Sequence, residues 1–349
     1  MRLSFISLTL ASAAAVIAGP LSPRADLAPA LPPDAFNTSH DGPLNLNDAK
    51  KKQLIVPGST KVYKDDSFRI KALCSNPSYR REWHSSSLTD AQRQNFVDAI
   101  KCLMRAPSKV AGSPAQNRYE DLVRLHQKFT PQVHGNRMFL LWHRYYLWTF
   151  EDILRKECSF TAPLPWFDET KYAGRFSQSS IFSAKWFGAI AIQGRCVTNG
   201  QFANTVLNIG PGTGNVRHCL SRNGDGAKTQ NTNAAMVKAC NDRDGFANMA
   251  ACSEGGAHAW GHNGIGSVMA DVYASVGDPT FWLHHGFIDR NFRVWQNQKA
   301  SRRTSIDGNG PNGAITMDTV INMDGIRPNV RVRDIMDTFE QGLCYRYDY

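Results

Sequence analysis

Six of the ten histidines in this 349-residue sequence form two groups of three, and their spacing restricts the folds available to the chain. The first group is His126 in YEDLVRLHQKF, His134 in the Pro- and Gly-flanked stretch PQVHGNRMF, and His143 in FLLWHRYYLWTFED. A helix, a loop and the next helix can turn three imidazoles toward one ion. The second group includes His258 and His262 in EGGAHAWGH, which share one helical face because they are four residues apart.

The third member of the second group comes from DPTFWLHHGFIDR, where His284 and His285 are adjacent. Geometry alone permits either of them, although His285 lies one helical turn before Asp289 and would share a face with it. A single buried histidine is often only a hydrogen-bonded core residue, but two complete groups make that interpretation much weaker. The other histidines lack partners at such spacings, and we assign them surface or structural roles: His40, His84 and His218.

The type of ligand indicates the metal. Imidazole suits zinc, copper, iron or nickel, while the lack of thiolates or paired carboxylates in these groups disfavours structural zinc and di-iron sites. The stretch HAWGH also lacks the glutamate of the HExxH motif, which excludes a zinc peptidase. Two groups of three neutral imidazoles suggest two copper ions, each open toward the other, that bind dioxygen between them and accept electrons from a phenol.

The hydrophobic pattern predicts a mainly helical domain. Thr89 is a plausible N-cap ahead of apolar residues at helical spacing. Further helices are expected at 117–128 (ending before Pro131), at 140–158, near His258 and at 278–299. Residues 173–255 are rich in Gly and Asn and contain several cysteines, so we expect long loops pinned by disulfides there.

The N-terminal region differs in composition from the rest of the chain. Its first residues, MRLSFISLTLASAAAVIAGP, have a basic start, an apolar stretch and small residues near Ala18, as a secretory signal peptide does. We therefore expect three parts: a signal peptide at 1–18, a Pro-rich arm or propeptide remnant at 19–68, and a catalytic domain at 69–349. The sequon Asn37-Thr38-Ser39 lies in the arm and predicts a glycan.

The eight cysteines and the charge distribution agree with a secreted protein. The cysteines are even in number and form no CxxC pair, so disulfides are favoured, although the sequence leaves 105 connectivities open. The net charge of +10 comes from scattered Lys and Arg, which gives no footprint for nucleic acid. No later run has the ~18 uninterrupted apolar residues of a membrane span. We expect no nucleic acid, no membrane and no obligate protein partner.

The two histidine stretches resemble a known family. HGNRMFLLWHRYYLWTFE is similar to the first copper motif of the tyrosinase and catechol oxidase family, and DPTFWLHHGFIDR is similar to the second. With EGGAHAWGH and the terminal CYRYDY, the resemblance covers roughly residues 70–349. It implies a type 3 dicopper enzyme that acts on small phenolic substrates with dioxygen. The implied ligands are His126, His134 and His143 for one copper, and His258, His262 and His285 for the other.

The resemblance also implies a fold and several departures from the family pattern. The fold is a mainly α, tyrosinase-like four-helix bundle with long disulfide-pinned loops and few short strands. His284 is then a neighbour that makes a supporting hydrogen bond. Leu141 replaces a proline of many members, and Gln132 stands where some fungal members have a cysteine that makes a thioether, so no such crosslink is expected. The chain ends at the Tyr345-Arg346-Tyr347 motif, so we expect no C-terminal segment over the site, as in short secreted fungal members.

Four further positions match those that control activity in the family. Val272 matches a gate that is a bulky Phe in some plant catechol oxidases, and Glu254 resembles an acid that holds a water. Ala259 follows His258 where good hydroxylases often have Asn, and Asn263 could partly substitute. We therefore expect oxidation of o-diphenols to o-quinones to exceed o-hydroxylation of monophenols. The alternative is a hemocyanin-like dioxygen carrier without turnover, and a disulfide-rich structural glycoprotein is a third possibility.

Overall fold

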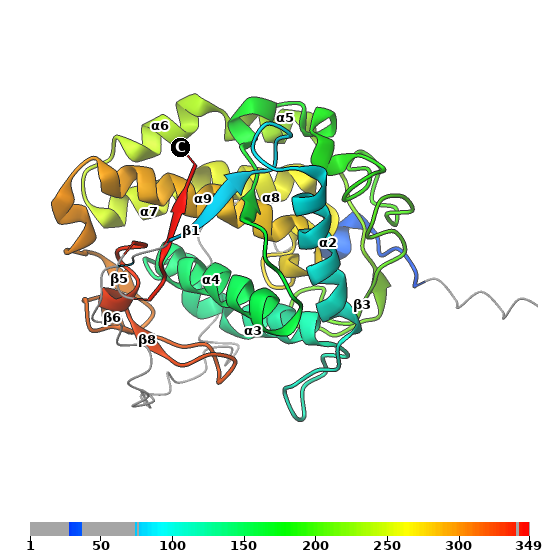
Figure 1. Cartoon of the computed structure of the whole chain (residues 1–349), viewed down its shortest axis with the longest axis horizontal. Coiled ribbons are helices and arrows are strands. Elements are labelled where there is room, and N and C mark those ends of the chain that lie inside the picture. Colours follow the sequence, from blue (N-terminus) through cyan, green and yellow to red (C-terminus); the bar gives the residue numbers. More distant parts are fainter. Residues whose placement is uncertain (1–27, 37–73, 75–76, 340–341, 349) are drawn as a thin grey trace, which may run out of the picture.

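The computed structural model describes residues 28–36, 74, 77–339 and 342–348, and it confirms a mainly helical fold with few short strands (Figure 1). The principal helices are α2 (Asp90–Arg105), α3 (Arg118–Val133), α4 (Phe139–Glu157), α8 (Ala259–Ile265) and α9 (Thr280–Asn297). Other α-helices are α5 (Gly226–Thr229), α6 (Ala234–Asn241) and α7 (Phe246–Ser253). The strands are β1 (Ser78–Glu82), β2 (Leu164–Trp166), β3 (Val206–Leu207), β4 (His218–Cys219), β5 (Asn309–Gly310), β6 (Gly313–Ala314), β7 (Val320–Ile321), β8 (Val330–Arg331) and β9 (Tyr345–Tyr347).

Helix α2 begins where the sequence predicts. The Thr89 hydroxyl accepts a hydrogen bond from the backbone N–H of Gln92 at 3.2 Å, and the Gln92 side chain accepts from the Thr89 N–H at 2.9 Å. This reciprocal pair is a capping box, which satisfies two N–H groups that have no partner within the helix. The predicted N-cap is therefore confirmed.

The expectation that the second helix ends before Pro131 is wrong. Helix α3 continues to Val133 with Pro131 in its last turn, and the N–H of His134 still donates to the carbonyl of Thr130 at 3.1 Å. A proline removes its own hydrogen bond to the preceding turn, but at a helix end the neighbouring residues can keep helical geometry. As a result His134 leaves the helix at its C-cap and enters the loop that leads to α4.

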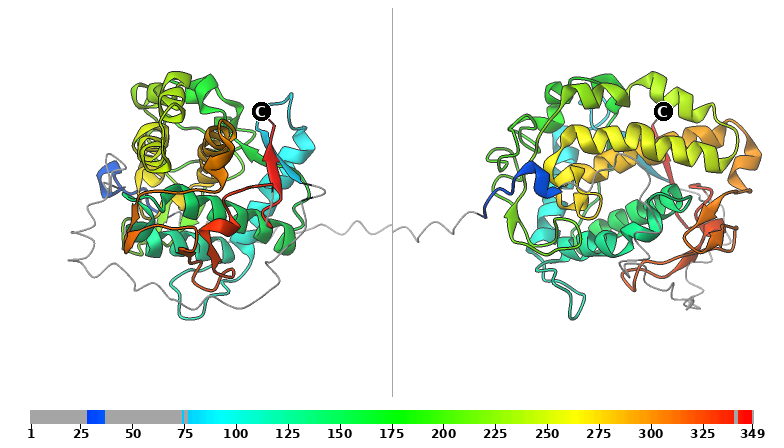
Figure 2. Two further views of the ribbon diagram at one scale, coloured as in Figure 1. Left: turned by 90° about the vertical axis from the view of Figure 1, so that its left-hand side faces the viewer. Right: turned by 180° about the vertical axis from the view of Figure 1, so that it is seen from behind.

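Four helical elements surround the centre of the molecule. Helix α4 packs against α3 and α9, and α9 packs against β2 and against the π-helical turn η7 (Glu254–His258) that precedes α8. Figure 2 shows α3 and α4 on one side of this centre and the α8 and α9 region on the other. A three-stranded parallel sheet in the order β2-β1-β9 packs on α9 through β2 and places β9 beside β1.

The region 173–255 is less irregular than predicted. It contains α5, α6 and α7, and a disulfide between Cys240 and Cys252 joins α6 to α7. Runs of Gly and Asn concealed these helices because each is only four to eight residues long. The prediction of disulfide pinning itself is confirmed, since all eight cysteines pair and none is free: Cys74–Cys344, Cys102–Cys158, Cys196–Cys219 and Cys240–Cys252.

A short part of the predicted N-terminal arm packs against the domain. The 3-10 turn η1 (Pro33–Phe36) contacts the turn η8 (Ser267–Ala270), and Figure 2 shows it lying against that side of the molecule. Phe36 is buried, with its ring 5.7 Å from that of His218. His218 is thus a structural residue, whereas His84 is exposed. The predicted signal peptide, the sequon at Asn37 and His40 lie outside the described residues.

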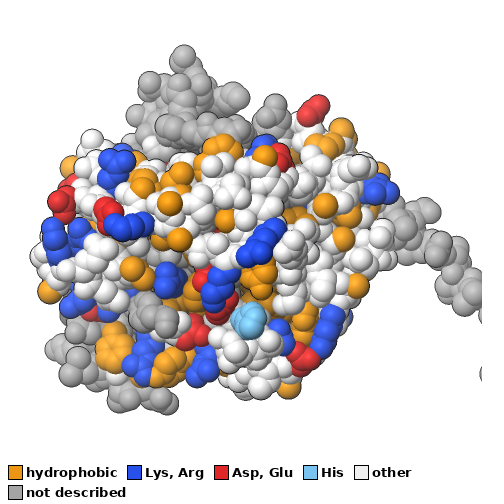
Figure 3. Space-filling model, turned by 90° about the horizontal axis from the view of Figure 1, so that it is seen from above, with side chains coloured by type: hydrophobic (Ala, Val, Ile, Leu, Met, Phe, Trp, Pro, Cys, Tyr) orange, Lys and Arg blue, Asp and Glu red, His pale blue; other side chains and the backbone are white. Residues whose placement is uncertain are grey.

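The surface carries mixed charge. On the face drawn in Figure 3, basic and acidic side chains are interspersed, and no broad basic stripe crosses it. Among the described residues, no helix has the length and hydropathy needed to cross a bilayer.

Candidate metal centre

The first three histidines meet between α3 and α4. Nε2 of His126 lies 3.2 Å from Nε2 of His143 and 3.2 Å from Nε2 of His134. The other ring nitrogen of each histidine contacts an oxygen: Nδ1 of His126 lies 2.8 Å from the Tyr273 carbonyl, and Nδ1 of His143 lies 2.8 Å from the Phe139 carbonyl. Nδ1 of His134 lies 3.2 Å from Oε1 of Glu254.

These contacts fix where the protons lie. A carbonyl oxygen can only accept, so Nδ1 of His126 and of His143 must donate a proton, and their Nε2 atoms are lone-pair acceptors. The Nε2 lone pairs of His126 and His143 at 3.2 Å repel each other unless a cation lies between them, and Nε2 of His134 lies equally close to that of His126. An outer hydrogen bond that fixes the tautomer and turns the lone pair inward is the usual arrangement around metal-bound histidine. The donor set of the first group therefore fits a metal ion.

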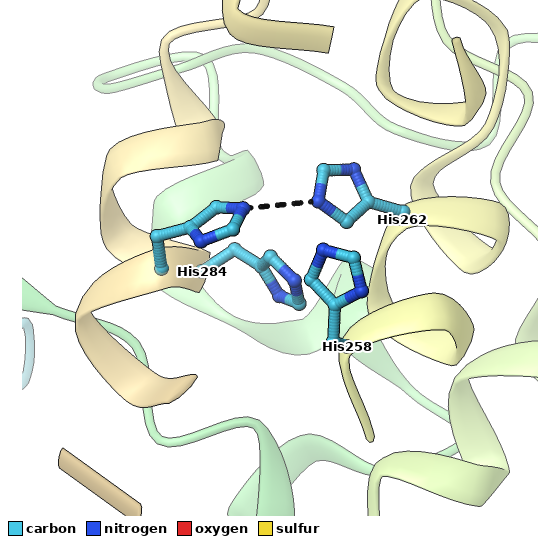
Figure 4. A group of neighbouring side chains, drawn as sticks. His258, His262 and His284 are labelled. Carbon is cyan, nitrogen blue, oxygen red and sulfur yellow. Dashed lines mark hydrogen bonds between the residues drawn. The ribbon is translucent and has the colours of Figure 1, made fainter. Parts of the chain in front are cut away.

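The second group lies between α8 and α9, and His258, His262, His284 and His285 each offer a nitrogen within 4.8 Å of the others. Figure 4 shows His258 and His262 projecting from one helix toward His284 on the next; its dashed line marks the 3.3 Å between Nε2 of His262 and Nε2 of His285. Nδ1 of His262 lies 2.7 Å from the Met269 carbonyl, and Nδ1 of His258 lies 3.1 Å from the Glu254 carbonyl. The same outward Nδ1 pattern thus occurs here.

The two groups adjoin. The rings of His143 and His285 stack at 4.6 Å with an interplanar angle of 13°. Two buried phenylalanines enclose them: the Phe139 ring lies 4.8 Å from His143 and 4.5 Å from His258, and the Phe281 ring lies 5.4 Å from His126 and 4.1 Å from His285. Each phenylalanine therefore contacts both groups, so the two sites share one apolar enclosure.

Burial keeps the imidazoles neutral. It lowers the pKa of His126 to about 4, and burial together with neighbouring histidines holds the pKa values of His134, His143 and His285 well below the ordinary value. Neutral imidazole is the form that binds a metal ion. These residues are therefore ready to bind at neutral pH without first losing a proton.

Glu254 connects the two groups. Its Oε1 accepts from the N–H of Gly135 at 2.8 Å and faces Nδ1 of His134, while its backbone carbonyl faces Nδ1 of His258. Burial raises the pKa of Glu254 to about 8. One residue thus contacts a histidine of each group, a role beyond that expected from the family resemblance.

The other three positions that the sequence predicts to control activity are all buried. Ala259 begins α8 directly after His258, and Asn263 lies on the same helix directly after His262. The Val272 carbonyl accepts from the Thr130 hydroxyl at 3.3 Å, which places Val272 beside α3.

Asp289 has a different role from the one its spacing suggested. Its carboxylate accepts from Arg144 at 2.7 Å and from the hydroxyls of Tyr345 and Tyr347 at 2.6 and 2.7 Å. Nδ1 of His285, in contrast, has no hydrogen-bond partner among the described residues. The helical spacing is as predicted, but Asp289 supports the contact between α9 and the end of the chain rather than the orientation of His285.

Sequence reasoning missed Glu169 and Gly261. Oε1 of Glu169 lies 2.6 Å from Nδ1 of His284, and both side chains are fully buried. Burial raises the pKa of Glu169 and lowers that of His284 to about 3. Glu169 is too far from His284 in the chain for a local motif to reveal the pair. Gly261 offered a signal, because a glycine within a helix usually has a packing reason.

The two adjacent groups of histidines in this helical core fit a pair of copper ions, so the structure is that of a dicopper protein. Comparison with known proteins identifies the family to which it belongs. The family model described as "Common central domain of tyrosinase" matches residues 116–298. The chain therefore belongs to the tyrosinase family of copper oxidases and is an enzyme of that type.

Individual relatives agree with the family. Tyrosinase ustQ of Aspergillus flavus is 32% identical over 295 residues, covering 78% of this chain and 80% of that protein. N-acetyl-6-hydroxytryptophan oxidase ivoB of Emericella nidulans is 28% identical, covering 78% of this chain and 93% of that protein. The structure of a point mutant of a polyphenol oxidase from Thermothelomyces thermophila matches with a TM-score of 0.71 and 26% identity, covering 88% of this chain and 99% of that one.

Proposed function

We propose that this protein is a secreted enzyme that uses two copper ions to oxidise o-diphenols to o-quinones with dioxygen, and that it hydroxylates monophenols more weakly. The proposal rests mainly on one observation, the convergence of Nε2 lone pairs in two adjacent groups whose Nδ1 atoms face outward. One copper would be held by His126, His134 and His143, and the other by His258, His262 and His285.

The copper pair, when bound, supplies the binding of dioxygen and the acceptance of electrons from the phenol. Each catechol gives up two electrons and two protons to become an o-quinone, and two catechols reduce one dioxygen to two waters. The chain contributes the rest. Phe139 and Phe281 exclude water around the histidines, and Glu254 orients His134 and, through its backbone, His258.

Two features support secretion and a small phenolic substrate. Four disulfides are typical of a protein that folds in an oxidising compartment. The relatives carry names that refer to tyrosinase or to a hydroxytryptophan oxidase, so hydroxylated aromatic rings are the shared chemistry of the group.

The proposed function is tested by copper analysis coupled to oxygen uptake. We expect two copper ions per chain and oxygen consumption on addition of 4-tert-butylcatechol. Copper-loaded protein that binds dioxygen reversibly yet leaves the catechol unoxidised would favour a hemocyanin-like carrier instead. A protein without stoichiometric copper would support the structural glycoprotein.

Weak hydroxylation of monophenols follows from Ala259. A monophenol must lose its proton before it is hydroxylated, and a water oriented by an acid and an amide can accept that proton. Oε1 of Glu254 is committed to Gly135 and His134, so such a water would rely on Oε2, and the methyl of Ala259 offers no second hydrogen bond. Asn263, one turn further along α8, would substitute only in part.

We therefore expect the initial rate on dopamine to exceed that on tyramine in the wild type, and Ala259→Asn to raise the tyramine rate relative to the dopamine rate by about tenfold. Both rates are measured as oxygen uptake on copper-saturated protein. Comparable wild-type rates on the two substrates would contradict the expected preference. An unchanged ratio in Ala259→Asn would show that this position does not cause it.

A further inference from the structure

Helix α8 contains two glycines, Gly261 and Gly264, in only seven residues. Each glycine in a helix interior costs about 1 kcal/mol relative to alanine, so packing must compensate. A Cβ on Gly261 would lie 2.5 Å from Cε1 of His284 and 2.8 Å from Oε2 of Glu169. A Cβ on Gly264 would instead overlap Thr229 on α5. Each glycine thus lets a different neighbour approach the helix backbone.

The neighbour at Gly261 is a buried pair of side chains from two other elements. Glu169 lies in the 3-10 turn η3 (Glu169–Tyr172) that follows β2, and His284 lies on α9. Nδ1 of His284 shares a hydrogen bond of 2.6 Å with Oε1 of Glu169, and the Thr232 hydroxyl donates to the Glu169 carbonyl at 3.5 Å. The outer atoms Oε2 of Glu169 and Nε2 of His284 have no hydrogen-bond partner among the described residues.

This pair lies directly against the second histidine group. The His284 ring is 4.5 Å from that of His262 and 5.4 Å from that of His258, and it is perpendicular to that of His285 at 5.2 Å. His258 ends η7 and His262 follows Gly261 on α8, while His285 follows His284 on α9. The pair therefore sets the separation between the two helices that carry this group.

His284 is less well placed than His285 to be the third member of the group itself. The Nε2 atoms of His262 and His285 approach to 3.3 Å, which reproduces the 3.2 Å spacings of the first group. His284 instead uses Nδ1 to bind Glu169. A ring held in this way acts as a spacer between α8 and α9.

We infer that Glu169 and His284 form a positioning pair, seated against Gly261, that holds the second histidine group in the geometry needed for copper. This inference rests on the proposed dicopper function. The hydrogen bond between Nδ1 of His284 and Glu169 fixes the orientation of the imidazole ring. Gly261, which has no side chain, leaves room for that ring. Without the hydrogen bond, the His284 ring can rotate and α8 can shift relative to α9.

The experiment measures the affinity of each copper site by titration against a competing chelator, in wild type, Glu169→Ala and Glu169→Gln. The amide oxygen of Gln can still accept from Nδ1 of His284, so this variant is the matched control. We expect Glu169→Ala to bind the second copper about 10- to 100-fold more weakly and the first copper normally, as for loss of other partners that orient metal-binding histidines. Glu169→Gln should stay within about threefold of wild type.

Two further measurements and one further variant make the result decisive. Half-loaded Glu169→Ala should show the paramagnetic resonance of an isolated Cu(II), and thermal unfolding of the copper-free protein reports any general damage. Gly261→Ala tests the same contact from the other helix, so it decides the matter if Glu169→Ala fails to fold. We expect it to weaken the second copper selectively as well.

The outcomes also separate this inference from the proposed function. Wild-type protein that binds fewer than two copper ions would overturn the proposed function. Wild-type protein with two copper ions, combined with unchanged second-site affinity in Glu169→Ala and Gly261→Ala, would overturn the positioning pair alone. Equal weakening in Glu169→Ala and Glu169→Gln would show that the hydrogen bond is not the cause.

Discussion

Replacing His285 with alanine is expected to abolish oxidase activity and to reduce bound copper from two ions per chain to one. Nε2 of His285 lies 3.3 Å from that of His262, and its ring stacks on His143 of the other group. The substitution removes one of three ligands and leaves a site that excess copper cannot complete. The adjacent change, His284→Ala, should leave substantial copper bound, because it removes only a supporting ring.

The two variants are distinguished by copper titration together with oxygen uptake on 4-tert-butylcatechol. In His284→Ala, the second copper should bind about 10- to 100-fold more weakly, and excess copper should restore both occupancy and activity. In His285→Ala, no excess should restore either. Equal copper loss from both variants at saturation would show that the assignment of His285 as the ligand is wrong.

The sequence predicts the histidines of this centre well because their signal is local. His258 and His262 lie on the consecutive elements η7 and α8, and His126, His134 and His143 follow one another through a helix, a loop and a helix. The helix boundaries are also close to those predicted, except where Pro131 is tolerated in the last turn of α3. Periodicity and capping depend on neighbours a few residues apart, so one sequence suffices to find them.

The partners that orient these histidines could not be predicted. Most are backbone carbonyls, such as those of Tyr273, Phe139 and Met269, and every residue has a carbonyl. Nothing in the sequence around Glu169 marks it, and it acquires a role only when the fold brings its side chain to Gly261 on α8 and His284 on α9. Long-range packing of this kind leaves no local pattern. For the same reason, the sequence relates Asp289 to His285 on the same helix and not to the distant arginines and tyrosines that it contacts.

Asp289 is the centre of a buried charge network that joins both ends of the described domain to α9. Burial alone would raise the pKa of Asp289, but the guanidinium groups of Arg144 and Arg80 hold it below the ordinary value. Arg80 comes from β1 and also pairs with Glu151 at 3.0 Å. The hydroxyls of Tyr345 and Tyr347 on β9 complete the shell. Asp289 thus compensates the buried cation of Arg144 and shares with Glu151 the compensation of Arg80.

Asp289→Ala is therefore expected to lower the free energy of unfolding by about 3–5 kcal/mol, because it removes the carboxylate that pairs with buried Arg144 and leaves Arg80 with Glu151 alone. The measurement is denaturant unfolding of the copper-free protein with its disulfides intact, so that copper binding does not contribute to stability. Asp318→Ala is the matched control. Asp318 also binds two arginines, Arg331 and Arg333, but its side chain is 54% exposed.

For this exposed control we expect a loss below about 1 kcal/mol, since solvent screens surface ion pairs. The contrast isolates burial, because each aspartate binds two arginines and only Asp289 lies in the core.

The pH dependence provides a second check. A carboxylate whose folded pKa is depressed contributes stability above its unfolded pKa and loses it as the pH falls through the folded value. The stability difference between wild type and Asp289→Ala should therefore be largest near neutral pH and shrink in acid. Equal losses in the two alanine variants, or a difference that grows in acid, would show that the Asp289 network does not hold the chain end to α9 by charge.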